Sequence, residues 1–289
     1  MPEFYTALET VGVDATKRFD FNHPLFQGSS FIVNDTANPQ QVLDAVRSVS
    51  SVKNAWPLRL ISRQPGHVLA KGTGPGKQKP SKLMKRASEG EWSTHAMTGV
   101  NKLHAEGYTG KDVLVAILDT GVDYKHPDLG GGFGEEFKVA KGYDFVGDNG
   151  VTDPSPDNDP FDGCGMHGTY IAGIIGANPG AINFKGVAPE AKLGMYRIFD
   201  CQLYTSEDII ISAYLKAYDD EADVIAISMG GYTGVNDGQY NEVIRLFYED
   251  LLIVFFIRPY VACCFAHCGS RYYLCCDSRR AWWPSIPSL

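Results

Sequence analysis

A short apolar segment that ends in a carboxylate constrains the fold of this chain more than any other feature. Residues 113–118 are apolar throughout, and the turn sequence Asp119-Thr120-Gly121 follows them directly. A short apolar run bounded by a turn signal is typical of a strand that is buried on both faces of a sheet. A carboxylate at its end is a candidate functional group, because the sites of open α/β sheets lie at the carboxyl ends of the strands.

Strand-like and helix-like segments alternate along the region that contains this run. Alternation at these lengths predicts right-handed crossovers and a parallel sheet covered by helices, so we expect an α/β fold. Besides 113–118, the expected strands are 192–198, 224–228 and 251–257, and the expected helices are 167–177, 206–219 and 238–249.

His167 begins one of the expected helices and lies 48 residues after Asp119. Gly168, Ala172 and Gly173 are small, so this helix can pack closely against its neighbours. An aspartate that orients a histidine, whose ring then takes a proton from a hydroxyl, is two thirds of a Ser-His-Asp triad. The alternatives are an ordinary turn carboxylate for Asp119 and a helix-capping or core histidine for His167.

Both segments resemble the Asp and His motifs of the subtilisin-like serine proteases, or subtilases. The family's Asp-Thr/Ser-Gly appears here at Asp119, and its His-Gly-Thr-His appears at His167, with Tyr170 in place of the second His. The resemblance implies a partial subtilisin-like three-layer domain with a parallel sheet. It also implies a serine-type endopeptidase in which Asp119 and His167 are catalytic, and no required cofactor or metal.

A further segment resembles the family's substrate-binding edge. The strand beginning at Asp223 leads into Ser228, Met229, Gly230 and Gly231, which match the family's Ser-x-Gly-Gly. The resemblance implies that these four residues bind polypeptide substrates by main-chain pairing, which holds an extended peptide whatever its sequence. Ser228 ends a strand, so it is not expected to be the nucleophile.

The family's nucleophile motif, Gly-Thr-Ser-Met-Ala, does not occur in the sequence, and neither does its oxyanion-hole Ala-Gly-Asn. Composition changes sharply at residue 258: residues 258–289 hold five of the seven cysteines and no lysine. We expect a truncated chain that lacks the serine nucleophile and ends in a non-homologous tail, more typical of out-of-frame or read-through translation than of a splice variant. The rival interpretation is a zinc site, although adjacent cysteine pairs fit zinc spacing poorly; its ligands would come from Cys263, Cys264, His267, Cys268, Cys275 and Cys276.

Only Cys164 and Cys201 remain outside the tail. The resemblance suggests a disulfide that ties the histidine loop to the substrate-binding edge, and two unpaired buried thiols are the alternative. The acidic loop 153–162 holds four carboxylates and could bind calcium, although its prolines prevent a regular ligand spacing and a solvated loop is the other interpretation.

The first part of the chain resembles a subtilase propeptide, in segments 4–12, 25–33 and 52–57. The resemblance implies a small α+β ferredoxin-like domain, with its first strand missing, that acts as an intramolecular inhibitor. By periodicity we expect helices at 3–11 and 38–49 and strands at 16–21, 28–33 and 52–56. The expected domains are 1–61 for the propeptide, 62–91 for a basic flexible linker, 92–257 for the partial catalytic domain and 258–289 for the tail.

Charge and hydropathy disfavour two classes of partner, nucleic acids and membranes. The net charge of −8 disfavours nucleic acid, and the apolar run from Leu251 is broken by Arg258-Pro259 and is too short for a membrane span. No signal peptide is visible at Met1, although the family implies an extracellular, secreted zymogen. A non-catalytic pseudo-protease, or a propeptide-type inhibitor that binds subtilases through residues 4–57, is the alternative function.

Overall fold

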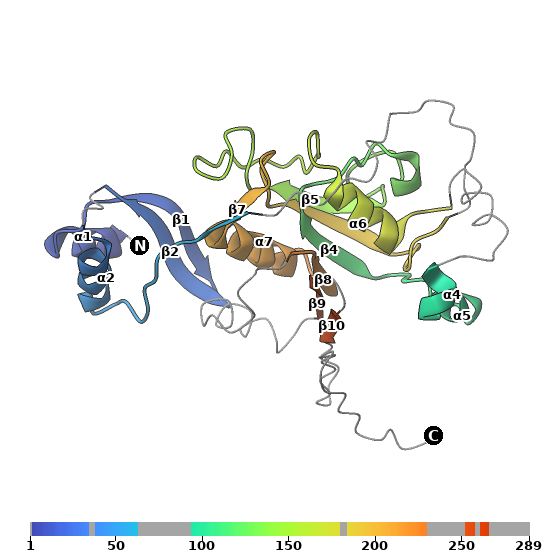
Figure 1. Cartoon of the computed structure of the whole chain (residues 1–289), viewed down its shortest axis with the longest axis horizontal. Helices are drawn as coiled ribbons and strands as arrows, with labels where there is room; N and C mark the ends of the chain where they lie inside the picture. The colour runs from blue at the N-terminus through green and yellow to red at the C-terminus, as the bar shows by residue number, and fades with distance from the viewer. Residues whose placement is uncertain are drawn as a thin grey trace, which may run out of the picture.

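The computed structural model describes residues 2–34, 38–62, 94–179, 184–229, 252–257 and 261–265. Its centre is a six-stranded sheet in the order β10-β9-β8-β4-β6-β5 (Figure 1). All neighbouring strands are parallel except β9 and β10, which are antiparallel. The strands are β4 (Leu114–Asp119), β5 (Val139–Asp144), β6 (Lys192–Arg197), β8 (Val224–Ile227), β9 (Leu252–Ile257) and β10 (Val261–Phe265).

The parallel sheet agrees with the α/β fold expected from the sequence, and four of its strands, β5, β6, β4 and β8, make up the part that carries the site. β5 is not among the strands expected from the sequence, because Val139–Asp144 is neither continuously apolar nor regularly alternating. Gly142 explains why β5 can lie so close to β6. A Cβ at this position would meet the Met195 carbonyl oxygen at 2.7 Å.

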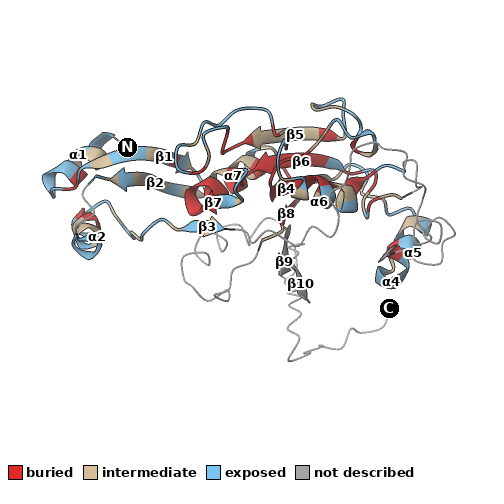
Figure 2. Ribbon diagram, turned by 45° about the horizontal axis from the view of Figure 1, so that its top comes forward, coloured by how far each residue is buried: buried red, intermediate tan, exposed pale blue. Residues whose placement is uncertain are grey.

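Two helices cover opposite faces of this sheet: α6 (His167–Gly176) and α7 (Glu207–Asp219) (Figures 1 and 2). Successive side chains of a strand point to opposite faces. Accordingly Val115 and Ile117 share one core cluster with Ala172 of α6, while Ala116 and Leu118 share another with α7. Because both faces are covered, β4 is apolar from Leu114 to Leu118 and becomes polar only at Asp119. The expected helix at 238–249 lies outside the described residues.

The N-terminal part contains α1 (Pro2–Thr10), β1 (Ala15–His23), β2 (Phe26–Val33) and α2 (Pro39–Ser48). β1 and β2 form an antiparallel pair, and both helices contribute to a small core, with Leu8 from α1 and Val46 from α2. The expected helices and the first two expected strands of this part agree with these elements.

The strand expected at 52–56 is wrong, because no strand is described there. Pro57 follows directly and cannot donate a ladder hydrogen bond, and the Ala55 carbonyl accepts two hydrogen bonds from Arg47 instead. The next strand is β3 (Leu60–Ser62), which pairs antiparallel with β7 (Tyr204–Ser206) rather than with β1 or β2. The ferredoxin-like propeptide fold is therefore not established, and the described sheet of this part has two strands, β1 and β2.

The remaining elements are α4 (Thr94–Thr98), α5 (Val100–Ala105) and the 3-10 helix η1 (Pro127–Leu129). Residues 63–93, almost all of the expected linker, and the tail beyond Phe265 lie outside the described residues. No described helix has the length and apolar character that crossing a membrane requires.

Candidate active site

Asp119 and His167 meet at the carboxyl end of β4. The two carboxylate oxygens of Asp119 lie 2.7 and 2.8 Å from Nδ1 of His167. Asp119 is 1% exposed, and the His167 side chain keeps 23% of its surface in solvent. Because a carboxylate only accepts, the neutral ring carries its proton on Nδ1, and Nε2 then holds the lone pair. The pair can therefore act chemically as an oriented general base.

Two glycines allow the aspartate turn and the histidine helix to touch. Gly121 has a φ of +95°, and a Cβ there would lie 2.7 Å from the Pro160 carbonyl oxygen. A Cβ on Gly168 would lie only 2.0 Å from the Gly121 carbonyl oxygen. Any larger side chain at Gly168 would force α6 away from the turn, so the sequences Asp-Thr-Gly and His-Gly fit each other at these positions.

A buried hydrogen-bond network fixes the turn against the histidine loop. The Thr120 hydroxyl donates to Asp162 Oδ2 at 2.6 Å and accepts from the Gly168 amide at 3.0 Å. Asp162 Oδ1 accepts from the amides of Cys164 and Gly165 at 3.0 and 2.6 Å. From the sequence, Asp162 is expected only to be one carboxylate of the acidic loop. The signal that could have found its role is Asp162-Gly-Cys-Gly, in which an aspartate side chain caps following amides.

Cys164 and Cys201 form a disulfide, with their Cα atoms 5.6 Å apart. Cys164 lies three residues before His167, and Cys201 lies just after β6. The bond therefore joins the loop that carries the histidine to the segment that leads into β7.

A buried ion pair between Arg197 and Asp144 lies beside the dyad, and it is not expected from the sequence. Arg197 is in register with Asp119 on one side and with Asp144 on the other, so three charged residues form a row at the strand ends. Arg197 Nη1 donates to Asp144 Oδ2, and the Asp144 Oδ1 accepts from the amides of Val146 and Gly147. Both partners are under 10% exposed, so the pair anchors the carboxyl ends of β5 and β6 from inside the protein.

The expected substrate-binding residues are only partly described. Ser228 and Met229 follow β8 directly and are partly buried, and Ile227 at the end of β8 is in register with Leu118 of β4. Ser228 therefore directly follows the strand next to the one that carries Asp119. Gly230 and Gly231 lie outside the described residues.

The carboxylates of the acidic loop take part in turns. Asp157 accepts from the Asp159 amide, Asp159 accepts from the Phe161 amide, and Asp162 belongs to the network of Thr120. Within the described ranges, no three His, Cys, Asp or Glu side chains gather into a group that could hold a metal ion. Calcium binding at this loop stays a prediction, and the fit of these side chains to the ion is poor.

Comparison with known proteins covers the same region. Residues 110–255 match the model of the subtilase family, Peptidase_S8. The chain is 42% identical over 132 residues to the minor extracellular protease Vpr of Bacillus subtilis, which covers 46% of this chain and 16% of that protein. It is 38% identical over 132 residues to subtilisin E of Bacillus subtilis, covering 46% of this chain and 30% of that protein. The chain thus spans less than a third of the length of either relative.

A crystal structure of fervidolysin from Fervidobacterium pennivorans is similar over 88% of this chain and 37% of that chain, with a TM-score of 0.55 and 20% sequence identity. At this identity the likeness concerns the fold alone.

Proposed function

The chain belongs to the subtilase family, and we propose that it carries the aspartate and histidine of a serine endopeptidase site, acting on polypeptides. The observation that carries this proposal is the contact between the Asp119 carboxylate and Nδ1 of His167. In this role His167 Nε2 removes the proton of a serine hydroxyl as that oxygen attacks a peptide carbonyl, and later returns it to the leaving amine. Asp119 holds the tautomer and stabilises the imidazolium.

The substrate is an extended polypeptide held along strand edges. A strand edge offers main-chain donors and acceptors that can bind an extended peptide of any sequence. The proposed pairing residues are Ser228, Met229, Gly230 and Gly231. The place of Ser228 beside the end of β4 supports this assignment.

Residues 1–61 are proposed to be the chain's own inhibitor, a propeptide, followed by a linker at 62–91, a catalytic part at 92–257 and a tail at 258–289. The pairing of β3 with β7 supports the inhibitor role of residues 1–61. It covers the edge of β7, the short strand that leads from the disulfide into α7. A secreted location is proposed from the family, and one similar protein is named extracellular.

The serine nucleophile is proposed to be absent from this chain, because the sequence has no Gly-Thr-Ser-Met-Ala. The decisive experiment is to sequence the transcript past codon 257 and to express the longest continuous frame. A frame that reaches Gly-Thr-Ser-Met-Ala should yield a peptidase, and His167→Ala should lower its kcat by about 10⁶. A frame with the motif but without His167-dependent hydrolysis would refute the proposed role of the dyad.

A second candidate function is a non-catalytic inhibitor or pseudo-protease. It is favoured by one observation: residues 2–62 have their own small core and dock on the catalytic part through charged groups. If the continuous frame ends without the serine motif, this second function takes precedence.

A further inference from the structure

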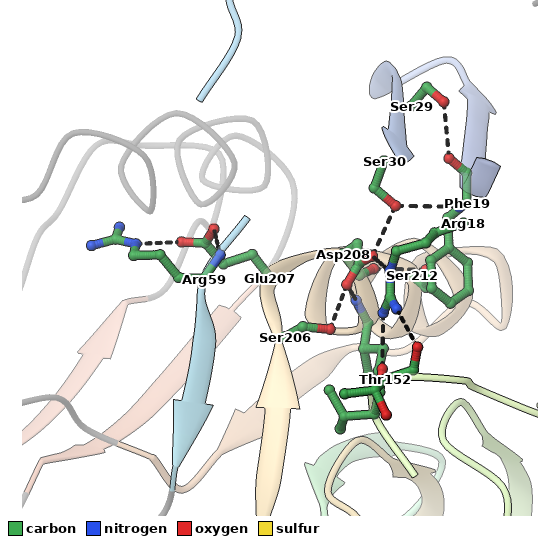
Figure 3. Close-up of polar contacts among 12 residues, drawn as sticks. Arg18, Phe19, Ser29, Ser30, Arg59, Thr152, Ser206, Glu207, Asp208 and Ser212 are labelled. Carbon is green, nitrogen blue, oxygen red and sulfur yellow. Dashed lines mark hydrogen bonds and ion pairs between the residues drawn. The ribbon is translucent and has the colours of Figure 1, made fainter. Parts of the chain in front are cut away.

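The first turn of α7 carries two adjacent carboxylates, Glu207 and Asp208, and each binds an arginine from the N-terminal part of the chain (Figure 3). Their side chains are only 9% and 1% exposed. A carboxylate removed from water is costly unless cationic and hydrogen-bonding partners replace the lost solvation. This turn of α7 therefore needs a partner that supplies positive charge.

Arg18 of β1 supplies that charge to Asp208. Its Nε donates to Asp208 Oδ2 at 2.9 Å, Nη1 to the Thr152 carbonyl at 3.0 Å and Nη2 to the Val151 carbonyl at 3.0 Å. The Arg18 side chain is 8% exposed. All three guanidinium nitrogens have acceptors, an arrangement that the point charge of lysine cannot reproduce.

The neighbouring strand contributes to the same contact. Ser30 of β2 donates to Asp208 Oδ2 at 2.8 Å, and its hydroxyl oxygen accepts from the amide of Phe19. Phe19 and Phe26 pack on the apolar cluster that α7 shares with the sheet. Both strands of the hairpin are thus positioned over one turn of α7.

Arg59 binds Glu207 through its backbone and its side chain together. The Arg59 amide donates to Glu207 Oε2 at 3.1 Å, and its Nε donates to Oε1 at 2.9 Å. Arg59 directly precedes β3, in which Leu60 is opposite Ser206 of β7. Glu207 therefore binds the arginine that directly precedes β3, the strand that pairs with β7.

We propose that Glu207 and Asp208 form a recognition site for two arginines, and that this site selects the chain's own residues 2–62 and sets the register of β3 on β7. The charged residues determine where the N-terminal part docks. The apolar side chains of the hairpin add buried contact area, but they do not determine the register of the strands. The consequence for activity rests on the proposed function, since only a peptidase site would be controlled by covering the β7 edge.

Hydrogen exchange of the full chain tests the proposal without any need for hydrolysis. Arg59→Gln should raise the amide exchange rates of segments 58–62 and 203–206 roughly tenfold or more, because the strand pair loses a charge-assisted anchor. Arg18→Lys should raise exchange in β1 and β2, because one ammonium nitrogen cannot reproduce the three separate nitrogens with which the guanidinium reaches its acceptors. Lys17→Gln is the matched control: its neighbour Arg18 is buried, whereas the Lys17 side chain is 59% exposed and forms an ion pair with Asp20.

Exchange in β4 and β6 of the same samples shows whether each variant is folded. The double variant Arg59→Gln/Glu207→Gln should exchange no faster than the faster single variant, because the two residues form one interaction. The proposal is overturned if Arg59→Gln and Arg18→Lys behave like Lys17→Gln, or if the effects of Arg59 and Glu207 add independently.

A peptide in trans tests the selection of arginine. A fluorescent peptide with the sequence of residues 57–62, Pro-Leu-Arg-Leu-Ile-Ser, is titrated into the Arg59→Gln chain beside the same peptide with Gln in place of Arg. The arginine peptide should bind about tenfold tighter, a difference of about 1.4 kcal/mol. Equal binding, or none, contradicts the recognition of arginine. Because binding is measured, a failed proposal on the peptidase role would leave this result unchanged.

Discussion

The hydroxyl of Thr120 donates a 2.6 Å hydrogen bond to the buried carboxylate of Asp162. A threonine hydroxyl has one proton, so this bond leaves only lone pairs for the Gly168 amide, which donates to the same oxygen. Asp162 therefore sets the direction in which Thr120 accepts. Through Gly168, this fixes the start of α6 and the ring of His167 relative to Asp119.

Replacing the Thr120 hydroxyl should destabilise the fold although the shape is kept. Thr120→Val removes the donor to Oδ2 of Asp162 and the acceptor of the Gly168 amide, at a cost of about 1–3 kcal/mol, although Oδ1 of Asp162 keeps its two amide donors. Urea unfolding of the full chain measures the loss. Thr152→Val, at an exposed threonine, is the control and should change the free energy of unfolding by less than about 0.5 kcal/mol. Equal effects of the two substitutions would contradict the role given to Thr120.

Removing the disulfide should destabilise the chain by about 3–4 kcal/mol, since Cys164 and Cys201 are 37 residues apart and their bond restricts the unfolded state. The variant is Cys164→Ala/Cys201→Ala, and the measurement is the urea midpoint. Reductant should lower the midpoint of the wild type to that of the variant and leave the variant unchanged. If the variant matched the oxidised wild type, the bond would contribute nothing to stability.

Breaking the buried ion pair should be more costly than breaking an exposed one on the same strand. Asp144→Asn leaves the Arg197 guanidinium buried without its carboxylate, a loss of about 3–5 kcal/mol. Lys141→Gln removes the pair with Glu135, whose side chains are 39% and 83% exposed, and should cost less than about 1 kcal/mol. Thermal and urea unfolding distinguish the two. A loss for Asp144→Asn no larger than for Lys141→Gln would show that water reaches Arg197.

Alkaline pH should weaken the fold through Tyr196. Burial, followed by the hydrogen bond to Asp220, raises the pKa of this phenol well above its ordinary value of 10.0. Below pH 10 the phenol is protonated in both states and its stabilisation is fully present. Above pH 10 only the unfolded state releases the proton, so stability falls by up to about 1.4 kcal/mol per pH unit.

Tyr196→Phe should therefore show a shallower decline above pH 10, together with a loss of about 1 kcal/mol at neutral pH from the missing hydrogen bond. Tyr108→Phe, at a residue that is 67% exposed, is the matched variant and should keep the slope of the wild type. Parallel slopes for all three proteins would mean that Tyr196 ionises equally in both states.

The chain as it stands should hydrolyse no peptide in a manner that depends on His167. If the serine motif is absent, as proposed, the dyad has no nucleophile to activate. The proposed absence of the oxyanion asparagine would remove about 3–4 kcal/mol more of transition-state stabilisation. Purified chain is incubated with a generic peptide substrate beside His167→Ala. Hydrolysis that disappears in His167→Ala would require another nucleophile in this sequence.

Local patterns in the amino-acid sequence are sufficient to predict the features that depend on neighbours along the chain. The apolar run before Asp119 predicted a buried strand, and the small residues after His167 predicted a closely packed helix, because burial imposes periods that local residues display. These features identified the α/β sheet and the family. The strand β5 escaped prediction, since its residues lie at the sheet edge and carry no clear period.

Features that depend on strand order and register become visible only in the three-dimensional fold. The row of Asp119, Arg197 and Asp144 exists because β4, β6 and β5 are neighbours in space, although they are far apart in sequence. In the same way, the link from Asp162 to Thr120 and the pairing of Leu60 with Ser206 join segments separated by 42 and 146 residues. Such contacts form only after the crossovers have brought the strand ends together, and no local pattern specifies them.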